Sequence, residues 1–74
     1  MSNWKLQTNK STRWFWINEK AFRMMNVEKI GGWWVADMFT TTKDYWSDRQ
    51  VAHLITKSKV TALKFAKRKM KEVA

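Results

Sequence analysis

His53 is the residue from which any catalytic or metal-binding chemistry would have to start, because it is the single imidazole in the chain. Nucleophilic catalysis needs a Ser, Thr or Cys beside a base that a third group holds in place. Asp44 and Asp48 are close in sequence, but nothing around them indicates an enclosed acid–base pair. One histidine among scattered carboxylates, with no Cys, offers no closed ligand set for a metal. The sequence therefore predicts a protein that is not an enzyme and has no catalytic residue, cofactor or metal site.

Basic residues give the strongest chemical signal. The 74 residues include fifteen Lys and Arg against six Asp and Glu, and the net charge is +9. Residues 56–74 contain seven of these basic residues and a single acidic one. This local excess goes beyond what solubility requires, so we expect this part of the chain to bind an anionic partner.

The same C-terminal segment has the pattern of an amphipathic helix. The stretch "TKSKVTALKFAKRKMKEV" starts with capping residues and has no Gly or Pro, which predicts a helix over 57–73. One stripe of this helix is apolar and should pack on a sheet: Ala62, Leu63, Ala66, Met70 and Val73. The opposite stripe is basic and should face solvent or a polyanion: Lys57, Lys64, Lys67, Arg68 and Lys71.

The segments that precede this helix have the features of strands. "RWFWI" alternates in residue types that favour strands, and "AFRMMNVEKI" fits a weaker strand, with helix as an alternative. Gly31 and Gly32 predict a two-residue hairpin turn into the strand "WWVADMF", because glycine accepts the positive φ angles of such turns. "SDRQVAHLIT" fits either a short helix or a strand, and we expect a strand.

Together these patterns predict the α+β class and one domain over 1–74. We expect an antiparallel three- to four-stranded sheet over 12–55, packed against one C-terminal amphipathic helix. Residues 1–11 are polar without periodicity, which indicates a loosely ordered arm or an edge segment.

The absence of Cys fits a reducing compartment, and no stretch has the ~20 apolar residues of a spanning helix. We therefore expect a cytoplasmic protein with no membrane span.

The aromatic residues are numerous enough to form the core of so small a domain. A sheet covered by one helix has one buried face and one open face, yet "RWFWI" and "GGWWVAD" place aromatic side chains on both. We expect Phe15 and Ile17 to pack against the helix. Trp14 and Trp16 would then point to the uncovered side, where they would contact either the N-terminal arm or a partner.

These features favour a non-enzymatic nucleic-acid-binding module, with duplex DNA as the preferred partner. The alternative is a small interaction protein, such as a regulator or inhibitor of the kind that viruses encode, that binds an acidic host protein. The residues expected to bind either partner are Lys57, Lys64, Lys67, Arg68 and Lys71, together with Arg13, Arg23, Trp14 and Trp16.

In outline, a sheet hairpin followed by a "T-x-S-x-V-x-A-L-x-F-A" helix resembles the arm-type DNA-binding modules of phage integrases and the related plant AP2-type domains. The resemblance concerns architecture alone, over about residues 13–71. It implies a three-stranded sheet that enters the major groove and a C-terminal helix behind it. "AFRMMNVEKI" departs from the tight first hairpin of those families, and the resemblance assigns no functional residue.

Overall fold

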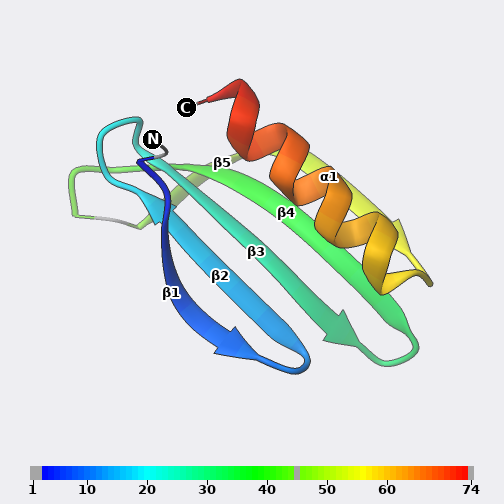
Figure 1. Cartoon of the computed structure of the whole chain (residues 1–74). Helices are drawn as coiled ribbons and strands as arrows, with labels where there is room; N and C mark the ends of the chain where they lie inside the picture. The colour runs from blue at the N-terminus through cyan, green and yellow to red at the C-terminus, as the bar shows by residue number, and fades with distance from the viewer. Residues whose placement is uncertain (1–2, 45, 74) are drawn as a thin grey trace.

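A computed structural model describes residues 3–44 and 46–73, which form one antiparallel sheet with a helix across one side (Figure 1). The α+β class and the C-terminal helix are confirmed, but the sheet has five strands rather than three to four. Strands follow the sequence order across the sheet, so each one pairs with its neighbours in the chain. The elements are β1 (Lys5–Lys10), β2 (Arg13–Asn18), β3 (Arg23–Ile30), β4 (Trp33–Thr41), β5 (Ser47–Thr56) and α1 (Lys59–Glu72).

Strand β1 is the element that the sequence did not predict. It pairs with β2 from Lys5↔Ile17 to Lys10↔Arg13, and its register shifts between Leu6 and Thr8. An edge strand has a partner on one side only, so a polar sequence such as "KLQTNK" can form it without apolar alternation. The prediction of a loosely ordered arm is therefore corrected for β1, and the edge-segment alternative fits it. Residues 1–2 lie outside the described residues.

The β3–β4 hairpin confirms the turn predicted at the two glycines. Gly31 has a φ of 61°, in the region that glycine adopts without steric cost, and Ile30 pairs directly with Trp33. The two ambiguous segments are both strands, since "RMMNVEKI" forms β3 and "SDRQVAHLIT" forms β5.

Helix α1 is two residues shorter at its start than the predicted helix, because Ser58 is its N-cap. The Ser58 hydroxyl accepts a 3.2 Å hydrogen bond from the backbone N–H of Thr61. The helix packs on β3, β4 and β5. Its apolar stripe is confirmed: Ala62, Ala66 and Met70 are buried, and Leu63 and Val73 pack against the core. The single helix of the described residues is too short and too polar to cross a membrane.

The core lies between this helix and one side of the sheet, which we call the helix side. Small side chains allow α1 to approach closely, because Ala36, Ala62 and Ala66 are all fully buried. The sheet contributes its largest buried side chains from the two central strands: Met25 and Val27 of β3, and Trp34 and Met38 of β4.

The predicted sides of the β2 aromatics are wrong. Trp14 pairs with Val27 and Trp16 with Met25, so both tryptophans lie on the helix side and pack against the core. Phe15 and Ile17 lie on the opposite side, away from α1. Alternation correctly separated the two pairs, but both pairs are apolar, so it did not indicate which one the helix covers.

Candidate nucleic-acid interface

The basic stripe of α1 lies on the outside of the molecule. Its helical members are three to four residues apart and share one face, opposite the buried side chains of Ala62, Ala66 and Met70. All of them are exposed. We call this group the basic surface, and its members are Lys64, Lys67, Arg68 and Lys71.

The charges of the basic surface are not neutralised within the described parts of the chain. The ion pairs found there join His53 to Asp37 and Lys69 to Glu72, so they leave the basic surface without a carboxylate partner. Like charges at this helical spacing repel by a few tenths of a kcal/mol per pair. A bound polyanion would relieve this repulsion.

Lys57 is exposed as well, but it lies just before α1 and apart from the basic surface. Its ammonium group is 4.9 Å from the centre of the Trp33 ring, which is a cation–π distance. Trp33 itself is 47% exposed at the tip of the β3–β4 hairpin. Lys57 therefore adds a positive charge at one end of the helix.

Trp14 and Trp16 lie beside the helix on the same side of the sheet. Lys59 Nζ is 5.1 Å from the centre of the Trp14 ring, and the Trp14 and Trp34 ring centres are 5.8 Å apart. The structure thus brings Trp14 close to the basic side chain of Lys59, although the rings of Trp14 and Trp16 are both half-buried in the core rather than free to stack on bases.

Arg13 and Arg23 do not join this surface. Arg13 lies on the other side of the sheet, where its guanidinium is 5.5 Å from the centre of the Phe15 ring and its Nε donates a 2.9 Å hydrogen bond to Asn26. Arg23 donates hydrogen bonds of 3.0 and 3.1 Å to the backbone oxygens of Ala21 and Phe22. It braces the β2–β3 turn, in which Phe22 has a φ of 54°.

Two further lysines belong to the helix side and were missed in the sequence. Lys59 covers Trp14, and Lys29 is exposed directly across from Trp34. Cross-strand partners share a face of the sheet, so Lys29 lies on the helix side. The two-residue Gly31–Gly32 turn already fixes this register, because pairing Ile30 with Trp33 places Lys29 opposite Trp34.

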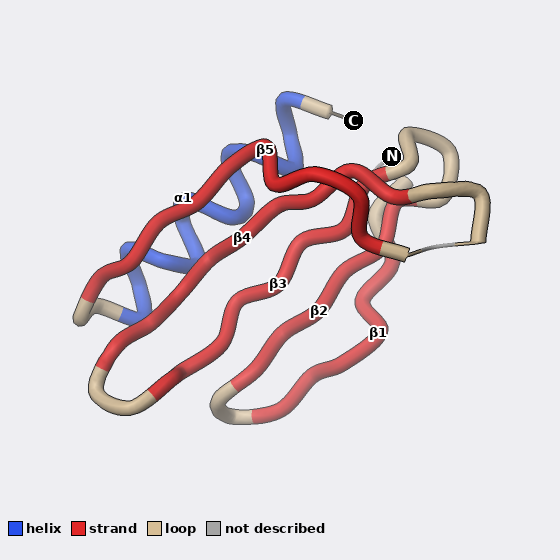
Figure 2. The backbone as a smooth tube through the Cα atoms, turned by 180° about the vertical axis from the view of Figure 1, so that it is seen from behind, coloured by secondary structure: helices blue, strands red, loops and turns tan. Residues whose placement is uncertain are grey.

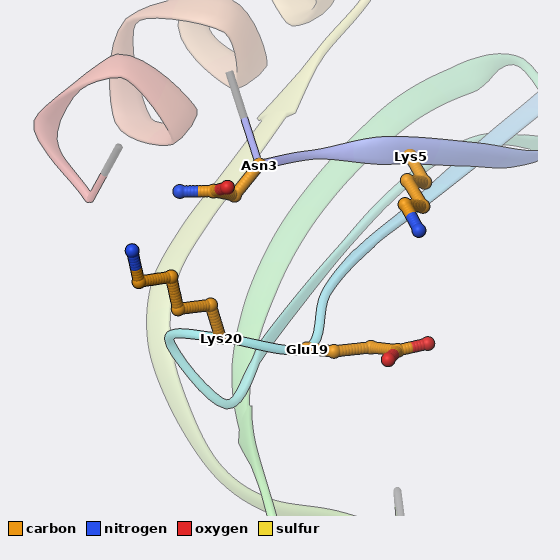
Figure 3. A pocket seen from close by; sticks show the side chains of 4 residues that line it. All are labelled: Asn3, Lys5, Glu19 and Lys20. Atoms are coloured by element: carbon orange, nitrogen blue, oxygen red, sulfur yellow. The ribbon is translucent and has the colours of Figure 1, made fainter. Parts of the chain in front are cut away.

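The surface also has a depression near the start of the chain. Asn3 and Lys5 line it from the N-terminal segment, and Glu19 and Lys20 line it from the β2–β3 turn. Figure 3 shows that Glu19 and Lys20 extend in opposite directions from this turn. Ligand pockets are mostly apolar with a few convergent polar groups, and this depression has neither feature.

No family model, curated protein or solved structure matches this chain. The candidate interface is therefore defined by its own charge and geometry.

Proposed function

We propose that this protein is a non-enzymatic nucleic-acid-binding module that binds duplex DNA through the basic surface of α1. The observation that carries this proposal is the row of exposed basic side chains without carboxylate partners in the described parts of the chain. From Lys64 to Lys71 the row is about 10 Å long, at roughly 1.5 Å per helical residue. A duplex carries about one negative charge per 1.7 Å of its axis, so a row of this length meets several phosphates.

The burial of Trp14 and Trp16 favours a duplex over a single strand. Proteins that bind single strands present aromatic rings on which successive bases stack. Here both indoles are packed against the core, so they support the surface instead of offering free stacking faces. A regularly spaced row of cations along a helix suits the regular phosphate backbone of a duplex.

Binding should depend little on base sequence. Three of the four residues of the basic surface are lysines, which act as point charges on phosphates, and Arg68 alone has a guanidinium that could bind a base edge in two places. Phosphate contacts set orientation and affinity but carry no sequence information.

A salt titration tests the proposal directly. Fluorescence anisotropy with a random 20-base-pair duplex should show a log–log salt slope of about −4, since each of four or five neutralised phosphates contributes about −0.9. Affinity should therefore fall by about two orders of magnitude between roughly 50 and 200 mM NaCl. Absence of binding at the lower salt concentration, or a slope near zero, would overturn the proposal.

Charge reversal locates the surface. The triple variant Lys64→Glu, Arg68→Glu, Lys71→Glu should bind the duplex at least about 100-fold more weakly, because three attractive contacts become repulsive. The matched control reverses three exposed lysines outside α1, Lys10, Lys20 and Lys43, and changes the net charge by the same amount. If the control loses as much affinity, the total charge and not the basic surface drives binding.

A competition experiment tests the alternative partner. If poly-glutamate displaces the labelled duplex as effectively as unlabelled DNA does, an acidic protein partner is favoured instead.

A further inference from the structure

The side of the sheet opposite α1, which we call the open face, is covered by none of the described elements. Figure 2 views the sheet from this side, with α1 behind it. Side chains alternate along strands, so the residues between the buried core positions point here. About half of them are apolar, and several of these are large: Phe15, Ile17, Met24, Ile30, Trp33, Val35, Phe39 and Ile55.

The open face differs from the helix side in charge. By strand alternation, its charged residues are Lys5, Lys10 and Arg13 against Glu28 and Asp37, so its net charge is only +1. The excess positive charge of the chain lies mainly on α1. A polyanion is therefore attracted mainly to the helix side, and much less to the open face.

The polar groups in the middle of the open face, on β2 to β5, are bonded to each other. Asp37 accepts a 2.7 Å hydrogen bond from Gln50 Nε2 and forms a second hydrogen bond with His53 Nδ1. Asn26 accepts from Arg13 and donates to Glu28. Burying a polar group costs little free energy when its hydrogen bonds are already made, so this row can be covered by an apolar surface.

We infer that the open face packs against the open face of a second copy of this chain, forming a two-fold dimer of stacked sheets. A two-fold interface needs a self-complementary surface, and a face that combines large apolar side chains with charges of both signs and a net charge of only +1 meets that requirement. Five strands about 4.8 Å apart and roughly 23 Å long make a plane of about 500 Å². A dimer would bury roughly 1,000 Å² or more in total, which corresponds to specific but weak association, with a Kd in the micromolar range.

This dimer would place its two α1 helices on opposite outer sides. If the basic surface binds duplex DNA, one dimer can join two duplexes. That consequence rests on the proposed function, whereas the dimer itself does not.

The oligomeric state and its salt dependence test the inference. In sedimentation equilibrium from about 5 to 500 μM, the mass should rise from 8.9 kDa toward twice that value. Association should be as strong or stronger at roughly 500 mM NaCl than at 50 mM, because salt screens the repulsion between two positively charged chains and leaves apolar burial intact. A mass that stays at 8.9 kDa at the highest concentration, or a dimer that salt dissociates, would overturn the inference.

Substitutions on the two sides of the molecule locate the contact. Ile55→Lys and Ile30→Lys change residues that are 52% and 57% exposed, so the monomer should fold while dimerisation weakens at least about 10-fold. Val60→Lys is the matched control, since Val60 is 61% exposed on α1 and receives the same charge. Circular dichroism verifies that each variant is folded. Unchanged association of Ile55→Lys and Ile30→Lys, or equal loss in Val60→Lys, would refute the open-face dimer.

The two proposals fail separately. The triple variant Lys64→Glu, Arg68→Glu, Lys71→Glu should lose duplex binding and keep the dimer, whereas Ile55→Lys should keep duplex binding and lose the dimer. If the unmodified protein does not bind a duplex, the proposed function is contradicted. Sedimentation equilibrium would still test the dimer.

Discussion

Tryptophan side chains have very different surroundings in this protein. Trp34 is 8% exposed and packs among β3, α1 and the ring of Trp14, whereas Trp46 is 74% exposed in the β4–β5 connection. The same residue type therefore stabilises the fold in one position and contributes little in the other. A small domain without disulfides depends on a few such buried aromatic residues.

Replacement of these two tryptophans should separate their contributions. Trp34→Ala should lower the free energy of unfolding by about 3–5 kcal/mol, through lost burial and the cavity left behind. Trp46→Ala should change it by less than about 0.5 kcal/mol, as expected for an exposed position. Urea denaturation followed by far-ultraviolet circular dichroism measures both. Equal losses in the two variants would contradict the assignment of the core.

The helix starts where a side chain satisfies one of its free backbone N–H groups. Ser58 supplies the N-cap, and the first turn of α1 has no acidic residue to interact with the helix dipole. Ser58→Ala should cost about 1 kcal/mol of stability, and Ser58→Asp should retain or raise stability, because aspartate caps well and adds a negative charge at the positive end. Ser11→Ala, at an exposed turn, is the control for thermal unfolding. No difference between Ser58→Ala and this control would contradict the role of the cap.

The elements with strong local signals were predictable, and those set by tertiary packing were not. The Gly31–Gly32 turn and α1 follow from backbone preferences and helical periodicity, which act over a few residues. Strand β1 has no such signal, because it forms by pairing with β2 at the sheet edge. In the candidate site, the exposure of the basic stripe was also predictable, because helical periodicity places it opposite the apolar stripe. The sides taken by Trp14 and Arg13 depend on which face α1 covers, and that is set by the packing of the helix against β3, β4 and β5.

For the molecule as a whole, charge is concentrated on one side and opposes folding. The basic surface contains four like-charged pairs at helical spacings of three or four residues, each worth a few tenths of a kcal/mol. Stability at low protein concentration should therefore rise by about 1 kcal/mol as NaCl increases from roughly 20 to 300 mM, through screening. Urea midpoints at both salt concentrations measure this.

Variants test whether the basic surface causes that salt effect. The triple variant Lys64→Glu, Arg68→Glu, Lys71→Glu should lose most of the salt dependence, because two of its four pairs, 64–67 and 67–71, then join opposite charges and offset the two pairs that remain like-charged. The control at Lys10, Lys20 and Lys43 should keep more of it. A chain whose stability falls with added chloride would show that attractive ion pairs outweigh the repulsion.

The sequence-ordered sheet also has a kinetic consequence. Every strand pairs with the strand before or after it in the chain, and α1 docks on β3, β4 and β5, so loops close over short stretches. Proteins with such local pairing cross a small entropic barrier and fold rapidly. The chain has no proline, so slow peptide-bond isomerisation does not delay it. The hydrogen bond from Trp4 to Met70 spans 66 residues, so it closes only after the sheet and helix are in place.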